Sequence, residues 1–542
     1  MIRYFLFSPE TIMNSRLIHH IKNLLLPCLA FSVLAGFLSA ILATAFKIAA
    51  EWVIHFSTFI YDTVRSDPAW IPIAIAGAAV TGLAASFILS NSRSCRGGGI
   101  PTSVAAIRGL VSFRWIASVF ILPFSALLTF LCGIPLGTEG PCVQMGTAVG
   151  DGIVQCLGSD KHKGWRRYIM TGGASAGFSV ATSSPVSAII FSMEELHKHF
   201  SPLLLTVASL SVVTAQITAQ LLAALGIGSV GLFDLPRIPA LPPKLLFVPI
   251  LIGLLCGGIS ILFTRFYQTV DKIVHAVLKK IPTKILFPIL FSCIFGVGIF
   301  LADSLGTGHN LVESLFHQKT AWYMLILIFL VRALFMMISN TAGATGGVFL
   351  PTLAFGAILG SLCAQALTCL GLISPDHSTL IVMLGIASFL GATSRIPVTA
   401  CVFALEALGG INNALAVICS ATVAFLIVEL SETEDFTDTI IKAKVRKINR
   451  GKAHTEAETS LTVAADSFAA GKELRDILWP NSCVVVSFER AKKNRGLVVV
   501  EEGDVITVHY KTYNLKATAQ ELCALVGEQP NNTFRELEDP EK

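Results

Sequence analysis

The stretch that decides the fold runs Gly137-Thr138-Glu139-Gly140-Pro141 and continues Cys-Val-Gln-Met-Gly-Thr-Ala-Val-Gly to Gly150. It places one carboxylate, Glu139, at the head of a segment of small and apolar residues, and the sequence on both sides is hydrophobic enough to lie in a bilayer. An ionisable side chain at the centre of a bilayer costs about 2.5 to 3.5 kcal/mol on insertion scales. Proteins keep such groups where they face a cavity, a partner or a transported ion, so Glu139 is the first candidate for function.

The composition is that of a membrane protein. Of the 542 residues, 53% are hydrophobic and 14% are charged, whereas about 25% of the residues of a soluble protein are charged. Long stretches between residues 20 and 430 are nearly free of charge, which predicts an all-α polytopic protein in the lipid bilayer. The net charge of +5 is modest and lies largely in connectors and the tail, so nucleic acid is not an expected partner.

The cysteines and the N-terminus add two expectations. The 13 cysteines are scattered singly, without a C-x-x-C pair or a Cys/His cluster, so we expect no metal site, no cofactor and no disulfide framework. Residues 1–22 are short and basic, and the apolar run that follows is too long for a signal peptide. The N-terminal segment is therefore predicted to be an uncleaved cytosolic or interfacial lead-in.

Hydrophobic segments of two kinds follow. Leu24–Ile60 and Trp70–Ser90 are long enough to span the bilayer. Many later segments are shorter than the roughly 20 residues of a full crossing, and glycine and proline interrupt them. Short, broken segments indicate helices that stop midway through the membrane, which is where transporters build their binding sites.

The membrane region contains an internal repeat. Pro185–Glu194 matches Pro397–Glu406, and Gly137–Pro141 matches Gly347–Pro351 at nearly the same offset. Two motifs repeated in the same order predict two related halves. The broken helices favour halves of inverted orientation.

The chain changes character after the second half. A basic stretch there is typical of a cytosolic exit from the membrane, and later residues alternate like strands. Strands are predicted at Val484–Phe488, Gly496–Val500 and Val505–Tyr510. The expected domains are an N-terminal segment 1–22, a first repeat 23–228, a linker 229–244, a second repeat 245–441, a basic linker 442–459, a small cytosolic α+β domain 460–528 and a polar tail 529–542.

Three glycine- and proline-rich helix starts stand out, at Gly97–Pro101, Gly137–Pro141 and Gly347–Pro351. Glycine lets the backbone turn sharply, and proline suits the first turn of a helix. A helix N-terminus offers free N–H donors and about half a positive charge, and a desolvated anion would satisfy those donors within a membrane. The alternative is helix kinks and close packing. Three such starts, two at corresponding places in the repeat, favour an anion site.

The order Gly-Gly-Gly-Ile-Pro, Gly-Thr-Glu-Gly-Pro, Pro185–Glu195 and Gly-Gly-Val-Phe-Leu-Pro resembles the CLC family of chloride channels and chloride/proton antiporters. The resemblance covers roughly residues 25–440. It implies an inverted-repeat fold whose broken helices meet at mid-membrane. It also implies a homodimer in which each subunit has its own anion pathway.

The resemblance assigns roles to individual residues. Glu139 falls on the family's gating glutamate, which blocks the pathway as a carboxylate and swings away when it is protonated or displaced by an anion. Glu195 falls on the internal, cytosol-facing glutamate of the proton-coupled members. Contacts with the anion are expected from Gly98, Gly99, Ile100, Gly140, Val348, Phe349 and Thr437.

Other charged residues in the membrane region have structural interpretations. Glu194 and Glu406 match each other in the repeat, so a structural role at an interface is favoured for both. Arg395 precedes Ile396-Pro397, where an anchor at a helix end is favoured over contact with a substrate. Arg332 is isolated in an apolar segment and has no assigned role.

Three positions depart from the family pattern. Gly98 stands where the family usually has serine, Thr138 where it has arginine before the gating glutamate, and Thr437 where it has a tyrosine that lines the central site. The side-chain hydroxyls at the central site are therefore absent or altered, while the backbone part is intact.

Gly173-Ala-Ser175-Ala-Gly177 fits the G-x-S-x-G pattern of hydrolases. That interpretation needs a strand, a turn and His/Asp partners, whereas this run is a small-residue membrane segment. Helix packing is favoured, and the protein is not expected to be an enzyme.

The tail carries a second resemblance. Ala470–Pro480 and the segments after it look like the C-terminal ligand-sensing domain of potassium-conductance regulators (TrkA-C), over about residues 455–528. The resemblance implies a dimerising regulatory module with an unknown ligand, and its small size argues for a bacterial protein. A passive dimerisation cap is the alternative.

These observations predict a bacterial inner (plasma) membrane chloride/proton antiporter with a cytosolic C-terminal domain, in which Glu139 and Glu195 handle protons. The first alternative is a passive voltage- or ligand-modulated anion channel of the same fold, because Gly98 and Thr437 weaken the inner constriction. A fluoride/proton antiporter is less favoured, because Glu195 and the segment around Phe349 follow the chloride type.

Overall fold

The computed structural model of the chain describes residues 26–90, 92–111, 113–158, 160–229, 231–449, 455–464, 467–480, 483–490, 499–512, 515–527 and 535–536. The N-terminal segment 1–22 lies outside these residues. Nine helices of the described part are long and apolar enough to cross a membrane. The helices of the membrane part are α2 (Leu26–Ser66), α3 (Ile71–Ser90), α4 (Ile100–Ile107), α5 (Trp115–Leu131), α6 (Glu139–Leu157), α7 (Arg166–Thr182), α8 (Pro185–Phe191), α9 (Pro202–Ala224), α10 (Phe247–Lys280), α11 (Thr283–Phe300), α12 (His309–His317), α13 (Trp322–Ala342), α14 (Phe349–Cys369), α15 (Ser378–Thr393), α16 (Pro397–Ala407), α17 (Ala414–Leu430) and α18 (Phe436–Ile448).

The long helices present large apolar side chains outward and small residues inward. On α2, Phe37 and Trp52 are 44% and 75% exposed, as expected of a surface that faces lipid. On the inner face of α2, a Cβ added at Gly36 would meet the carbonyl oxygen of Ser211 on α9 at 2.3 Å. Small residues thus let the helix backbones approach closely, which is how helices associate in a membrane.

Short helices confirm the expectation of broken segments. Helices α4, α8 and α16 have 8, 7 and 11 residues, too few for the roughly 20 of a full crossing. Each has proline in its first turn, where the missing N–H removes no intrahelical bond. Helix α4 therefore begins among buried residues, whereas Val186 and Val398, the second residues of α8 and α16, are exposed.

The two halves of the repeat meet at the equivalent residues Gly137 and Gly347. The backbone N–H of each donates to the carbonyl of the other at 2.7 Å, in an antiparallel bridge. Helices α6 and α14 begin two residues later, at Glu139 and Phe349. The contact brings the two N-termini together, as an inverted relation of the halves requires.

Glycine faces hold the helices of each half together. A Cβ at Gly146 of α6 would meet the carbonyl oxygen of Gly173 on α7 at 2.0 Å, and a Cβ at Gly177 would meet that of Cys142 at 2.3 Å. Ser175 lies on the same α7, where its hydroxyl donates to the Thr171 carbonyl at 2.9 Å. The G-x-S-x-G run is therefore a packing face within a helix, and the strand and turn of a hydrolase site are not present there.

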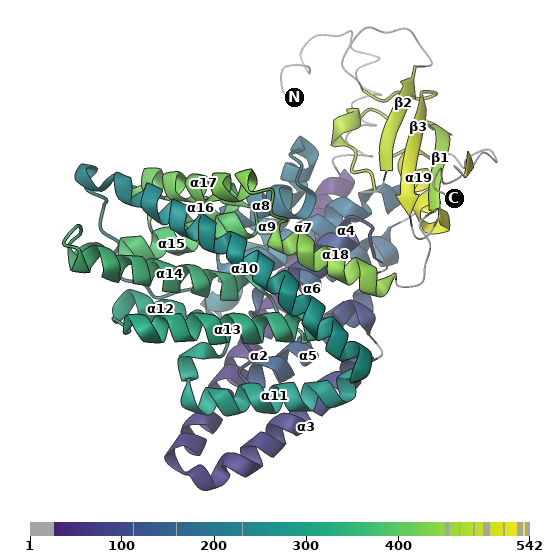
Figure 1. Ribbon diagram of the computed structural model, residues 1–542. Helices are drawn as coiled ribbons and strands as arrows, with labels where there is room; N and C mark the ends of the chain where they lie inside the picture. Colours follow the sequence, from purple (N-terminus) through teal and green to yellow (C-terminus); the bar gives the residue numbers. More distant parts are fainter. Residues whose placement is uncertain are drawn as a thin grey trace.

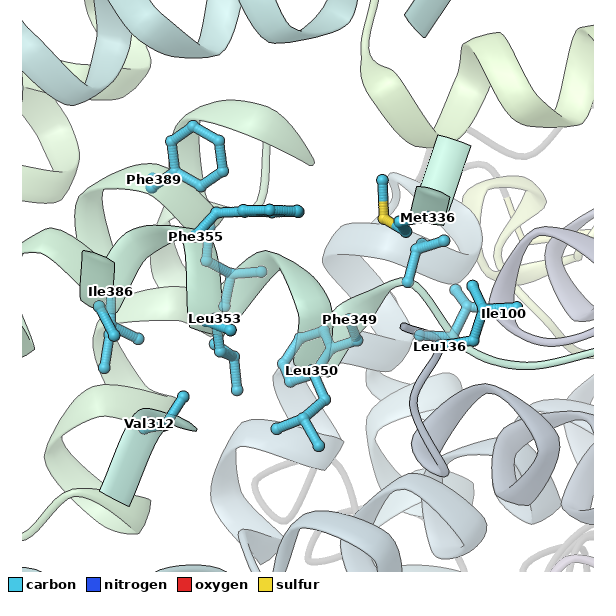
Figure 2. Packing of buried hydrophobic residues seen from close by; sticks show 14 of the residues in the cluster. Ile100, Leu136, Val312, Met336, Phe349, Leu350, Leu353, Phe355, Ile386 and Phe389 are labelled. Atoms are coloured by element: carbon cyan, nitrogen blue, oxygen red, sulfur yellow. The ribbon is translucent and has the colours of Figure 1, made fainter. Parts of the chain in front are cut away.

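Large apolar side chains fill the second half. Phe355 of α14 and Phe389 of α15 lie with their ring centroids 6.3 Å apart, and Phe263 of α10 packs edge-on against Phe389. Figure 2 shows this cluster together with Phe349 and Leu350 at the start of α14. The buried packing continues from the second half to the N-terminus of α14, and it holds that helix start in place.

The C-terminal module is a four-stranded antiparallel sheet with one helix. Its strands β1 (Thr455–Thr462), β2 (Cys483–Glu489), β3 (Val505–Thr512) and β4 (Arg535–Glu536) lie in the order β2-β3-β1-β4, and the helix is α19 (Leu515–Val526). Strand β1 begins before residue 460, within the stretch predicted to be a linker. Most of the strand predicted at Gly496–Val500 lies outside the described residues.

The module packs against the ends of the membrane helices, beside α4 and α7 in Figure 1. The hydroxyl of Tyr168, at the start of α7, accepts a hydrogen bond from the Leu478 amide at 3.0 Å and donates one to the Asp476 carbonyl. Arg167 forms an ion pair of 2.6 Å with Glu521 of α19. The contact is thus specific and includes both charged and backbone groups.

Candidate anion and proton site

Three helix starts converge at one point between the two halves. A Cβ added at Gly140 would meet the Cα of Gly347 at 2.5 Å and the Cα of Gly99 at 3.2 Å. Gly99 also has φ = +120°, a conformation open to glycine but not to residues with a Cβ. The predicted residues Gly99 and Gly140 therefore lie next to each other and to Gly347, which precedes the predicted Val348, at the starts of α4, α6 and α14.

Gly98 lies beside this contact. Its neighbours leave no room for a side chain at position 98. A Cβ there would meet Leu122 Cδ1 at 2.5 Å and Gln144 Oε1 at 2.8 Å. Leu122 is on α5 and Gln144 is on α6. Serine, the usual family residue at this position, would clash with both unless they moved.

Gln144 is a residue of the site that the sequence did not reveal. Its Oε1 accepts the Gly99 N–H at 2.7 Å, and its Nε2 donates to the Ser94 carbonyl and to the Ser118 hydroxyl, both at 3.1 Å. The fully buried amide therefore holds the turn before α4 against α6. A glutamine inside a small-residue membrane segment is the signal that could have identified it.

The Glu139 side chain is completely buried at the start of α6. Its Oε1 accepts a hydrogen bond from the Thr138 hydroxyl at 3.4 Å. Oε2 has no hydrogen-bond partner within the described residues, although the backbone N–H groups of Glu139 and Leu350 act on the carboxyl group electrostatically. The carboxylate thus lies between the N-termini of α6 and α14, where a bound anion would be stabilised by the same groups.

Phe349 holds the start of α14 in place through aromatic contacts. Its ring packs edge-on against Phe178 at 5.0 Å and against Phe403 at 5.5 Å between ring centroids. Phe178 also stacks on Phe191 at 4.4 Å. Phe403 and Phe191 are equivalent residues of the two halves, so each half contributes one of these aromatic rings.

Glu195 lies in the π-helical turn Ser192–His197, which is separate in sequence from the three helix starts. Its side chain is buried, because the residue is only 3% exposed. Arg108, which follows α4, donates to the Glu195 carbonyl at 2.9 Å and to the Leu196 carbonyl at 3.0 Å. The side chain of Thr437 lies against the Glu195 carboxyl group. Thr437 and Glu195 are therefore brought together by the fold.

Several charged residues lie around Glu195. Lys198 forms ion pairs with Asp435 at 3.0 Å and with Asp438 at 2.5 Å, and Arg108 lies 3.5 Å from Asp438. Lys198 is 39% exposed, whereas Asp435 is nearly buried. Asp435, Lys198 and Arg108 also act electrostatically on the buried Glu195 carboxyl group.

A lysine of the last membrane-associated helix also contacts the first helix start. Lys444 of α18 donates from Nζ to the Gly97 carbonyl at 3.1 Å and to the Thr102 hydroxyl. These contacts cross from the end of the membrane region to its beginning. No local pattern indicates these contacts, because Lys444 is far from Gly97 and Thr102 in the chain.

The two isolated arginines have structural contacts. Arg332 is fully buried and donates to the carbonyls of Leu305 and Gly306 at 3.0 and 2.9 Å. Arg395 pairs with Glu429 at 3.2 Å and donates to the Thr433 carbonyl. Arg332 thus holds a connector before α12, and the contacts of Arg395 are those of an anchor between helix ends.

Comparison with known sequences establishes the class of protein. The family model described as voltage gated chloride channel matches residues 81–429, more than half of the chain. The chain therefore belongs to the voltage gated chloride channel (CLC) family and is a multi-pass membrane protein. The match ends before the C-terminal module.

Two relatives carry the name H(+)/Cl(-) exchange transporter ClcA. The one from Vibrio vulnificus is 24% identical over 387 residues, which is 70% of this chain and 81% of that protein. The one from Klebsiella pneumoniae is 25% identical over 432 residues, which is 78% of this chain and 90% of that protein.

Solved structures share the fold. A slow cyanobacterial Cl-/H+ antiporter superposes with a TM-score of 0.71 at 21% identity, over 78% of this chain and 99% of that chain. A CLC-type fluoride/proton antiporter superposes with a TM-score of 0.61 at 20% identity, over 78% of this chain and 98% of that chain. At these identities the likeness establishes the fold alone.

Proposed function

We propose that this protein exchanges chloride for protons across the membrane. The observation that carries the proposal is the buried Glu139 carboxylate between the N-termini of α6 and α14. A carboxylate in that position imitates an anion, so chloride and the side chain compete for one set of N–H groups. The relatives named as H(+)/Cl(-) exchange transporters support the same reaction.

In this mechanism Glu139 alternates between two states. As a carboxylate it occupies the anion site and closes the pathway. When it takes up a proton it loses its attraction to the helix N-termini, and chloride takes its place. Exchange follows because the anion and the deprotonated side chain exclude each other from the site.

Glu195 supplies the proton from the cytosolic side. Its carboxyl group is buried, yet the ion pairs of Lys198 with Asp435 and Asp438 connect it with solvent. A proton that reaches Glu195 can pass to Glu139 through the protein interior without following the chloride. The two carboxyl groups thus give protons and anions separate entrances.

A passive anion channel of the same fold is the second candidate. The observation that favours it is the loss of hydroxyls: Gly98 has no side chain, and the Thr437 side chain lies against Glu195. An anion held by backbone groups alone would be retained less strongly. Such a site passes anions more readily and couples them less tightly.

Flux measurements in liposomes distinguish the two functions. A chloride gradient imposed on the purified protein drives protons against their own gradient if the protein is an exchanger. The variant Glu195→Gln retains chloride flux and loses proton movement, whereas the exposed Glu432→Gln on the same face of the protein behaves as the wild type. Chloride flux of the wild type without proton movement would establish the channel instead.

The assembly and the tail belong to the same proposal. We infer a homodimer in the inner membrane of a bacterium, with the C-terminal module in the cytosol as a TrkA-C-like regulatory domain with an unidentified ligand. Val186 and Val398, the second residues of the equivalent helices α8 and α16, are 51% and 49% exposed, and a partner subunit would cover them. Cross-linking in native membranes tests it.

A further inference from the structure

A cavity of about 290 Å³ lies where the C-terminal module meets the ends of the membrane helices. Arg108, which follows α4, and Arg167 of α7 line it from the membrane region, and Arg475 lines it from the module. We propose that this cavity binds a phosphate group, which the three arginines hold between the two parts of the protein. The inference rests on the regulatory role proposed for the module, and it names the chemistry and the place of the unidentified ligand.

The walls of the cavity combine positive charge with apolar surface. His197, His199 and Trp479 line it beside the arginines, and the remaining lining residues are leucine or isoleucine. Among the described residues, no aspartate or glutamate lines it. Small-molecule sites have a few polar groups within mostly apolar walls, and they begin at about 300 Å³. The cavity therefore has the size of a site for a small ligand, and its charged groups favour an anion.

The arginines of the membrane region have hydrogen-bond donors to spare. A guanidinium group has five N–H donors. Within the described residues, Arg167 donates to Glu521 alone, at 2.6 Å, and Arg108 donates to two backbone carbonyls and to Asp438 at 3.5 Å. These carboxylates are not among the residues that line the cavity. The remaining N–H groups match the acceptor oxygens of a phosphate, which arginine binds in a forked geometry.

Burial strengthens the effect of these charges. The side chains of Arg108 and Arg167 are 11% and 12% exposed, and electrostatic interactions are stronger where water is excluded. Burial, and then these two arginines, lower the pKa of His197 to about 3. The imidazole ring is therefore neutral, and the arginines carry the charge of this wall. The same surroundings that disfavour a protonated histidine would stabilise a bound anion.

Hydrogen bonds fix the module side of the cavity to the membrane region. The Tyr168 hydroxyl bonds to the Asp476 carbonyl and to the Leu478 N–H. The Nε2 atom of His199 lies 2.9 Å from the Arg475 carbonyl. Both walls are thus in place before a ligand arrives, and a site formed in advance loses less entropy when it binds.

One lining residue connects the cavity with the candidate proton site. Arg108 lines the cavity and also donates to the Glu195 carbonyl at 2.9 Å. A phosphate that draws the guanidinium group toward the cavity loosens its contact with the turn that carries Glu195. Binding at the module can therefore act on transport through this side chain.

Calorimetric titration of the solubilised full chain with sodium pyrophosphate, at constant ionic strength, tests the site. We expect saturable binding to the wild type. Arg167→Gln removes a charge-assisted hydrogen bond and should weaken the affinity about tenfold or more. Glu521→Gln breaks the same ion pair but keeps the cation, so it should bind at least as tightly as the wild type. Arg446→Gln, at an exposed position of α18, controls for net charge and should leave the affinity unchanged.

A second variant tests the module side. The Arg475 side chain is 67% exposed, so Arg475→Gln leaves the packing of the interface intact and should also weaken binding. Binding that both Arg167→Gln and Arg475→Gln leave unchanged overturns the inference, because pyrophosphate then binds elsewhere. Equal losses of affinity in Glu521→Gln and Arg167→Gln also overturn it, because the ion pair and not the cation is then what matters.

A lipid headgroup and a soluble compound can both present the phosphate. The wild type and Arg167→Gln are therefore reconstituted with equal parts of phosphatidylglycerol and phosphatidylcholine, extracted again, and analysed for bound lipid by mass spectrometry. Phosphatidylglycerol that the wild type retains and the variant loses assigns the site to a headgroup. Pyrophosphate binding without a retained lipid assigns it to a soluble ligand. The absence of both overturns the inference.

Flux measurements separate the site from the regulatory role on which it rests. Chloride flux in liposomes is compared with and without pyrophosphate on both sides of the membrane. A change of flux in the wild type that Arg475→Gln abolishes supports regulation through this cavity. Unchanged flux together with the expected pattern of binding overturns the regulatory role of the module and leaves the phosphate site established.

Discussion

Glu194 caps the start of the helix that contains Glu406, and Glu406 caps the start of the helix that precedes Glu194. The Glu194 carboxylate accepts the N–H groups of Val398 and Thr399 at the start of α16, at 3.0 and 2.7 Å. The Glu406 carboxylate accepts those of Val186 and Ser187 at the start of α8, at 3.1 and 3.0 Å. The reciprocity follows from the repeat, because equivalent residues exchange equivalent contacts across an approximate twofold axis.

The first prediction concerns these caps. Replacing either Glu194 or Glu406 by alanine leaves two N–H groups at a helix start without their partner, and a lost cap costs about 0.5 to 2 kcal/mol. Each variant should lower the midpoint of thermal unfolding in detergent to a similar extent, whereas the exposed Glu432→Ala should not. A large effect from one alone would show that the two caps are not equivalent.

The second prediction concerns Gly98. The variant Gly98→Ser restores the usual family residue but forces its Cβ against Leu122 and Gln144. Overpacking of this kind costs about 1 to 3 kcal/mol. The single variant should unfold at lower temperature than the wild type, and a second change, Leu122→Ala, should recover part of the loss. Full stability of the single variant would show that α5 can move aside.

The third prediction concerns the gate. Glu139→Gln removes the negative charge that competes with chloride and the group that carries the proton. Chloride flux should persist and lose its dependence on pH, while proton movement should fall by about 100-fold or more. Flux assays between acid and neutral pH measure both. Proton movement that survives in this variant would remove Glu139 from the proton pathway.

The fourth prediction concerns the contact with the module. Tyr168→Phe removes the hydroxyl that bonds to two backbone groups of the module, and it leaves the ring in place against Trp165 and Phe468. A lost hydrogen bond of this type costs about 1 kcal/mol, and more where the partner stays unsatisfied. The linker before β1 should then be cleaved faster in limited proteolysis. Equal cleavage rates would show that the hydroxyl does not hold the module.

The local sequence predicted the secondary structure well where glycine and proline determine the backbone conformation. Helix starts were expected within Gly137–Pro141 and Gly347–Pro351, and α6 and α14 begin within these stretches, at Glu139 and Phe349. The beginning of the module was misplaced for a local reason. Strand β1 reads Thr-Glu-Ala-Glu-Thr-Ser-Leu-Thr, with only Ala457 and Leu461 as apolar signals, too few to indicate a strand.

The sequence by itself determined that broken helices begin at three glycine-rich turns and that one of these carries a buried carboxylate. These features follow from backbone geometry and from the cost of a charge in the membrane. Tertiary structure alone decided which side chains complete the site: Gln144 behind Gly99 and Thr437 against Glu195. Such partners depend on how whole helices rotate and pack, and a local pattern of residues does not record that arrangement.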